Sequence, residues 1–161
     1  MELYLLRHGI AEPGRPGLSD SDRALTSEGK KKLKEFLRAV AGMRVRPELI
    51  LSSPLVRAKQ TAAIAVEELN YRESVAITPA LEPETAPAVA WEEVRLHKDV
   101  KELMLVGHEP LFSQLFAHLL GAPSLTVDFK KGALARIDLE AFGPRPKGVL
   151  RWLLPPRLAH E

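Results

Sequence analysis

The sequence contains no cysteine among its 161 residues. This absence excludes disulfide scaffolds, thiolate zinc sites and cysteine nucleophiles together. No apolar run approaches the roughly 18–20 residues that a membrane-spanning helix needs. An arginine already stands at position 7, too early for a secretory signal peptide. We therefore expect a cytoplasmic protein that makes no contact with a membrane.

Aromatic residues are also few, and the net charge is small. Aromatics make up 6% of the chain, and 23 basic against 21 acidic residues leave a net charge of +2. A nucleic-acid surface needs a more basic domain with interleaved aromatics, so we expect no nucleic-acid partner. Residues 130–161 hold seven basic and three acidic residues, which is most simply a solvated face. The apolar content of 45% and the length favour a single globular domain over residues 1–161.

Short apolar runs alternate with helical patterns along the chain. Runs at 2–6, 49–51 and 102–106 predict buried strands. Further strands are expected at 75–77, 132–139 and 148–154, followed by an irregular tail at 155–161. Strands that alternate with helices predict an α/β fold, with a mainly parallel sheet covered on both faces.

Capping residues mark the starts of the expected helices. Thr26 is a typical N-cap for an amphipathic helix that ends at Gly42. Ser53 and Pro54 predict the cap and the first position of a second helix. An acidic loop leads to a third helix near 87–97, and Pro110 opens a fourth.

Cationic and imidazole side chains follow three of the expected strands. Arg7 and His8 follow the first strand, and His108 follows the strand at 102–106. Arg57 lies in the first turn of the helix after the second strand, where helical side chains lean back toward the amino end. The carboxyl ends of parallel strands line one crevice, so these four side chains should converge. Two guanidinium groups and a helix N-terminus suit a phosphate dianion.

Three segments carry a resemblance to a known family. Leu5-Leu6-Arg7-His8-Gly9, the block from Ser52 to Ala62, and Val106-Gly107-His108-Glu109-Pro110 resemble the histidine phosphatase superfamily, which includes the phosphoglycerate-mutase-like enzymes. The short length and the Arg23-Ala-Leu-Thr26 segment look most like the compact SixA-type phosphohistidine phosphatases.

The resemblance implies a three-layer α/β/α fold and a metal-independent phosphatase without a cofactor. It implies that His8 is the nucleophile and forms a phosphohistidine intermediate. Arg7, Arg57 and His108 would then hold the phosphate. Gly9, Arg23 and Glu109 are expected as additional contacts, and Arg23 is equally well explained as a loop cation.

The general acid is the point at which the sequence departs from larger family members. Glu82 and Glu84 lie in the expected loop, but not in a clear register, and both are equally typical of a solubilising loop. An alkoxide leaving group needs a proton, whereas an imidazole leaves as a neutral ring once its other nitrogen is protonated. A weak acid therefore favours phosphohistidine in a protein as the substrate. The alternatives are a small phosphate ester, or a phosphate-binding module without turnover.

Overall fold

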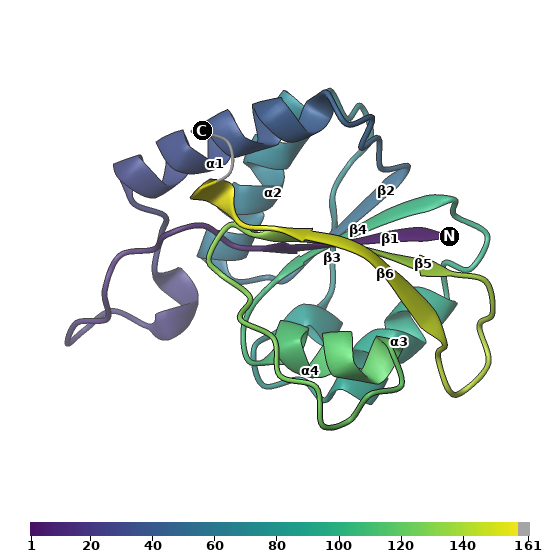
Figure 1. Cartoon of the computed structure of the whole chain (residues 1–161). Coiled ribbons are helices and arrows are strands. Elements are labelled where there is room, and N and C mark those ends of the chain that lie inside the picture. The colour runs from purple at the N-terminus through teal and green to yellow at the C-terminus, as the bar shows by residue number, and fades with distance from the viewer. Residues whose placement is uncertain (158–161) are drawn as a thin grey trace.

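The computed structural model describes residues 1–157, and its centre is a sheet that lies between two layers of helices (Figure 1). The sheet order is β3-β2-β4-β1-β5-β6. Its strands are β1 (Glu2–Arg7), β2 (Leu49–Ser52), β3 (Ala76–Ile77), β4 (Glu102–Gly107), β5 (Leu134–Leu139) and β6 (Gly148–Leu154). The α/β/α architecture predicted from the alternating pattern is confirmed.

The pairing of the strands sets three strand ends side by side. β1 and β2 both pair in parallel with β4, and β3 extends this parallel part beyond β2. In register, Arg7 lies opposite Gly107 and Ser52 lies opposite Val106. The residues that follow these three strands therefore lie side by side, at the carboxyl ends of the strands. β5 and β6 add an antiparallel hairpin at the other side of β1.

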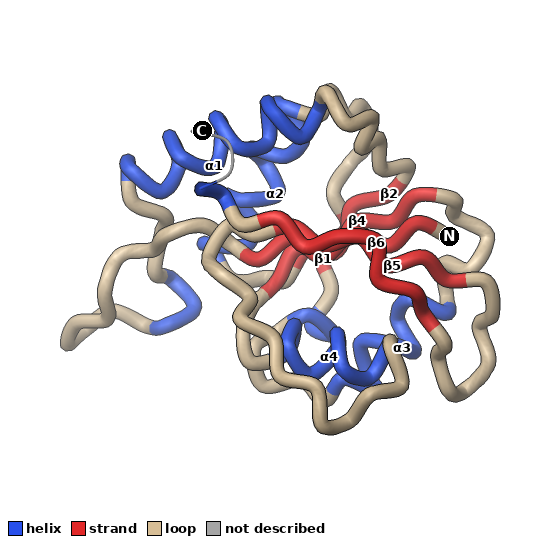
Figure 2. Tube along the Cα trace, viewed as in Figure 1, coloured by secondary structure: helices blue, strands red, loops and turns tan. Residues whose placement is uncertain are grey.

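Helices cover both faces of the sheet (Figure 2). α1 (Ser27–Ala41) and α2 (Val56–Glu68) pack on one face, and α3 (Pro87–Arg95) and α4 (Leu111–Leu119) on the other (Figure 1). The predicted N-cap of α1 is confirmed, because the Thr26 hydroxyl accepts a hydrogen bond from Gly29 N at 2.9 Å. Two short 3₁₀ helices, η1 (Asp20–Asp22) and η2 (Pro79–Leu81), lie in the loops before α1 and after β3.

The alternation of side chains along β1 builds two separate cores. Leu3 and Leu5 pack among the residues under α3 and α4, whereas Tyr4 and Leu6 pack against α1 and α2. All four are at most 1% exposed. Burial on both faces explains why this strand reads as a continuous apolar run. No helix within residues 1–157 is long and apolar enough to cross a membrane.

The predicted start of the second helix is wrong by two residues. α2 begins at Val56 with Leu55 as its N-cap, and Pro54 precedes the helix. Ser53 continues the strand direction, because its backbone N–H bonds to Val106 O at 3.0 Å. The third helix ends at Arg95, earlier than expected. The last four residues of the predicted irregular tail lie outside the described part of the chain.

Candidate active site

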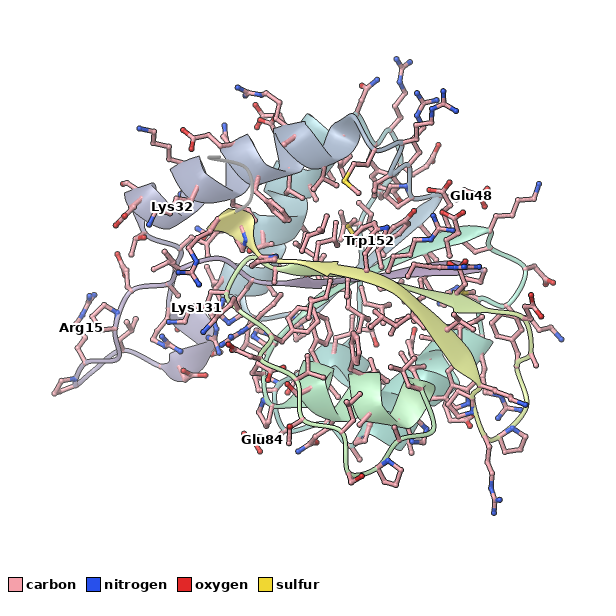
Figure 3. The ribbon with its side chains drawn as sticks, in the orientation of Figure 1. Arg15, Lys32, Glu48, Glu84, Lys131 and Trp152 are labelled. Carbon is pink, nitrogen blue, oxygen red and sulfur yellow. The ribbon has the colours of Figure 1, made fainter. Side chains whose placement is uncertain are left out.

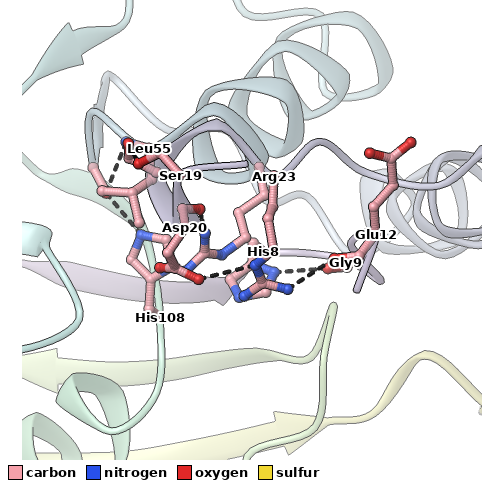
Figure 4. A network of polar contacts seen from close by, with 11 residues as sticks. His8, Gly9, Glu12, Ser19, Asp20, Arg23, Leu55 and His108 are labelled. Carbon is pink, nitrogen blue, oxygen red and sulfur yellow. Dashed lines mark hydrogen bonds and ion pairs between the residues drawn. The ribbon is translucent and has the colours of Figure 1, made fainter. Parts of the chain in front are cut away.

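Two histidines and a buried arginine lie together at the carboxyl ends of the parallel strands, as the sequence predicts. His8 and His108 lie with ring centroids 5.1 Å apart and planes tilted by 52° (Figure 4). His8 is 6% exposed, His108 1% and Arg57 4%. Burial lowers the pKa values of both imidazoles, and the positive charges of Arg57 and Arg7 lower them further. All four candidate residues therefore share one site.

The ring of His8 is held in a defined tautomer. Its Nδ1 lies 2.7 Å from Gly9 O. A carbonyl oxygen only accepts hydrogen bonds, so Nδ1 carries the proton and Nε2 keeps its lone pair. Burial, with smaller contributions from Arg57, Arg7 and Lys131, lowers the pKa of His8 to about 4. The imidazole is therefore neutral at pH 7, and its Nε2 is free to act as a nucleophile.

His108 is oriented by a buried serine. Its Nε2 lies 2.7 Å from Ser53 Oγ, and Ser53 Oγ also accepts a hydrogen bond from Leu55 N at 3.2 Å. Within residues 1–157 the Ser53 hydroxyl makes no other hydrogen bond that could use its own hydrogen, so we assign that hydrogen to His108 Nε2. This arrangement leaves the proton of His108 on Nδ1. Burial, followed by the charges of His8 and Arg57, lowers the pKa of His108 to about 3.

The guanidinium of Arg57 is anchored by the loop that precedes α1. Its Nη1 donates to Asp20 O at 2.7 Å, and its Nη2 donates to Asp20 Oδ2 at 3.1 Å. The other carboxylate oxygen of Asp20 accepts from Arg23 Nε at 2.9 Å. Arg23 also donates to Glu12 O at 2.9 Å (Figure 4). Arg23 therefore reaches the site through Asp20, which joins the two arginines.

Arg7 is anchored from the opposite side of β1. Its Nη1 donates to Phe129 O at 2.6 Å. Burial lowers the pKa of Arg7, while the negative charges of Glu109 and Asp128 oppose this shift. Both arginines are thus fixed at their outer nitrogens by backbone oxygens.

Unpaired buried polar atoms are concentrated at this site. Within residues 1–157, four buried side-chain polar atoms have no hydrogen-bond partner. Three of them are Arg7 Nε, Arg57 Nε and His108 Nδ1. Buried donors without partners are rare, and each costs free energy until a partner arrives. Three donors beside the free nitrogen of His8 are suited to an oxyanion such as phosphate.

The remaining predicted residues have different surroundings. Gly9 contributes its backbone, because its carbonyl holds His8 and its N–H donates to Thr61 Oγ1 at 3.2 Å. Glu109 accepts hydrogen bonds from the backbone and hydroxyl of Ser113, so its carboxylate is used at the start of α4. Gly107 is needed for packing, since a Cβ there would lie 2.8 Å from the ring of Phe112.

The two candidate acids make no polar contact through their carboxylates within residues 1–157. Glu82 is half-buried and Glu84 is exposed. In the part of the chain that the structure describes, neither carboxylate makes a hydrogen bond or an ion pair. Figure 3 shows Glu84 at the surface, on the opposite side of the sheet from Lys32.

Three residues of the site were not assigned a role there from the sequence. Asp20 has no local signal, because it meets Arg57 only through the path of a loop. Ser53 shows only a capping pattern. Thr61 could have been found, since it lies one helical turn after Arg57, and its hydroxyl bonds to Arg57 O at 2.8 Å.

The described residues, 1–157, contain no group of three or more His, Asp or Glu side chains that could hold a metal ion. The site itself offers a neutral imidazole beside several cationic and N–H donors.

Comparison with known proteins agrees with this chemistry. The family model of the histidine phosphatase superfamily (branch 1) matches residues 3–83, which contain His8 and Arg57. Together with its fold, this match defines the chain as a phosphatase. The chain belongs to the histidine phosphatase superfamily.

Several proteins of known name are similar to this chain over nearly its whole length. The phosphohistidine phosphatase SixA of Escherichia coli (strain K12) is 28% identical, over 97% of this chain and 94% of that protein. A structure of the protein histidine phosphatase SixA complexed with tungstate has a TM-score of 0.86 and 28% identity, and covers 97% of each chain. A putative α-ribazole-5′-P phosphatase from E. coli has a TM-score of 0.74 over 97% of this chain and 98% of its own. Its 24% identity shows the fold alone.

Proposed function

We propose that the chain transfers a phosphoryl group from its substrate to Nε2 of His8 and then to water. In the first step the P–Nε2 bond forms as the bond from phosphorus to the leaving group breaks. In the second step water attacks phosphorus, the P–Nε2 bond breaks, and inorganic phosphate leaves. Two steps through a covalent intermediate replace one difficult displacement. The whole chain would act as a single domain, with side chains alone and no metal or cofactor.

The observation that carries this proposal is the fixed tautomer of His8. Its Nδ1–H is bound to Gly9 O at 2.7 Å, which leaves Nε2 as the nucleophilic nitrogen. When phosphorus bonds to Nε2, the imidazole gains positive charge, and the Gly9 carbonyl stabilises that charge at Nδ1.

The donors of Arg7, Arg57 and His108 would hold the oxygens of the transferring phosphoryl group. Their buried nitrogens are preorganised, so little reorganisation is needed when charge develops on these oxygens. Tungstate is also a tetrahedral oxyanion, and its complex with a SixA protein of the same fold supports an oxyanion site here.

We further propose phosphohistidine in a protein as the substrate. Neither Glu82 nor Glu84 makes a hydrogen bond or an ion pair within residues 1–157, so no contact of this kind positions either carboxyl group as an acid. A phosphorylated imidazole depends least on such an acid, because its other nitrogen can be protonated by solvent. The similarity to SixA over nearly the whole chain supports the same substrate class.

A small phosphate ester is the second candidate. The half-buried position of Glu82 favours it, because a carboxyl group there could protonate an alkoxide once a substrate is bound. A catalytically inactive phosphate-binding module is disfavoured, since all four central side chains are present and lie at one site.

Three substrates tested side by side distinguish these proposals. We expect kcat/KM to be highest on a phosphohistidine peptide, lower on an aryl phosphate and lowest on phosphoglycerate. A higher kcat/KM on phosphoglycerate would support the ester phosphatase. Absence of turnover on all three, with phosphate still bound, would support the binding module.

A further inference from the structure

A cationic cavity opens beside the candidate active site, on the Arg7 side. Its volume is about 540 Å³, and it shares the side chain of Arg7 with the phosphate pocket. Its other charged lining residues are four cations and one acid: Lys32, Lys130, Lys131, Arg157 and Asp128. The remaining wall is apolar and includes Ile10, Pro155 and Pro156. An anionic group that reaches out of the active site in this direction meets positive charge.

Lys131 is held next to His8 by a tight turn. Ala133 N bonds to Lys130 O at 3.0 Å, and Gly132 has φ of +77°, which glycine adopts readily. Gly132 N also donates to His8 O at 2.9 Å. The turn therefore ties Lys131 to the backbone of the proposed nucleophile. Its charge contributes to the lowered pKa of His8, and no carboxylate within residues 1–157 forms an ion pair with it.

The other two lysines of the cavity are exposed, and each forms an ion pair with one exposed carboxylate. Lys32 pairs with Glu28 and Lys130 with Asp128, both at 2.9 Å, and the lysine side chains are 49% and 53% exposed. Such surface pairs are worth little, so a bound carboxylate can replace the partner at small cost. Figure 3 shows Lys32 and Lys131 at the same end of the molecule.

The spread of these charges indicates what kind of anion they attract. A single small anion is usually held by buried donors that converge on it, as in the phosphate pocket itself. Here the cations come from α1, from the turn at Lys131 and from the segment after β6, and they surround a partly apolar wall. Distributed exposed charges around apolar area are typical of a surface that steers and orients a protein partner.

We propose that this cationic cavity binds acidic residues that flank the phosphohistidine on a protein substrate. The inference rests on the proposed function and adds a charge requirement on the substrate's surface. The basic surplus of residues 130–161, which composition alone assigns to a solvated face, supplies Lys130, Lys131 and Arg157 to this contact.

The test compares two synthetic peptides of equal length, each with one phosphohistidine. One peptide has aspartate and glutamate around the phosphohistidine, and the other has serine and glycine. We expect the intact chain to favour the acidic peptide at least about fivefold in kcat/KM at low salt, and this preference should fade as salt screens it. In the double variant Lys32→Gln/Lys131→Gln the ratio should fall to within about twofold of one.

The matched control is Lys101→Gln/Lys147→Gln. These lysines lie beside Met1, at the end of β1 away from His8. This control removes the same two charges and should keep the preference. Use of a ratio cancels any effect of Lys131 on the reactivity of His8, because both peptides depend on it equally.

Each outcome has one meaning. Equal kcat/KM for both peptides on the intact chain would overturn the charge requirement and leave the proposed function standing. Equal losses on both peptides in the Lys32/Lys131 variant, with the ratio unchanged, would mean that the lysines act on the phosphate or on His8 and not on the flanking residues, and would also overturn the proposal. No turnover of either peptide, with hydrolysis of an aryl phosphate intact, would refute the phosphohistidine substrate together with the docking surface.

Discussion

Replacement of Ser53 by alanine tests how His108 is prepared to donate to phosphate. Ser53 is fully buried, and its Oγ lies 2.7 Å from His108 Nε2. Without the hydroxyl, Nε2 is a buried acceptor with no partner, which costs about 1–3 kcal/mol. In the alternative tautomer the proton lies on Nε2, so Nδ1 of His108 can no longer donate a hydrogen bond to the phosphate. Since about 1.36 kcal/mol is a factor of ten in rate, we expect kcat to fall roughly 5- to 150-fold.

Ser52→Ala is the matched control for this variant. Ser52 is also fully buried at the same strand end, but its hydroxyl donates to Ser53 O at 2.9 Å and does not contact His108. Both variants lose one buried hydroxyl, so a comparison of their Tm values corrects for a general loss of stability. The ¹⁵N shifts of His108 should report a proton on Nδ1 in the intact chain and a shifted tautomer in Ser53→Ala. An unchanged tautomer, or a kcat equal to that of Ser52→Ala, would refute the reasoning.

Three further predictions concern pH, the candidate acids and metals. The pKa of His8 is lowered from 6.5 to about 4. After correction for substrate ionisation, kcat/KM should therefore stay constant from pH 7 to about 5 and fall as the pH approaches 4. A fall in kcat/KM centred near pH 6.5 would contradict a buried, neutral imidazole. The unfolded chain takes up this proton near 6.5, so the free energy of unfolding should also decrease on acidification between about 6.5 and 4. Glu82→Gln and Glu84→Gln should each lower kcat/KM on phosphohistidine less than about tenfold, or roughly 1.4 kcal/mol, and a much larger loss in one variant would identify the acid and favour an ester substrate. Activity should survive EDTA, and loss of turnover that a divalent metal restores would argue against catalysis by side chains alone.

The sheet and the convergence of the site follow from local sequence patterns. The run from Leu3 to Leu6 is apolar at every position because both faces of β1 are buried, so it identifies a central parallel strand. Once the first, second and fourth strands are parallel neighbours, His8 and His108 must emerge at the same edge. The alternating pattern predicts parallel strands whose carboxyl ends share one crevice, but the order β3-β2-β4-β1-β5-β6 comes from the structure.

The supporting residues of the site could not be predicted in the same way. Asp20 holds Arg57 across 37 positions of sequence, through a loop whose path depends on the packing of η1 against α2. Ser53 reads as a helix cap because hydroxyl caps are local, whereas its partner His108 lies 55 positions away. Glu109 is expected from the sequence as an additional contact at the site, but its carboxylate accepts a hydrogen bond from Ser113 N, four residues further on. Its partner is local, so a helix cap would have been the simpler prediction.

The covalent intermediate on His8 is the most direct test of the mechanism. Rapid quenching of the intact chain during turnover should trap an acid-labile, base-stable phosphoryl group, and mass spectrometry should locate it on His8. His8→Ala should lose at least about 10³-fold in kcat, on the order of 4 kcal/mol, and still bind phosphate through Arg7 and Arg57. A phosphoryl group on any other residue, or near-normal turnover by His8→Ala, would contradict the account.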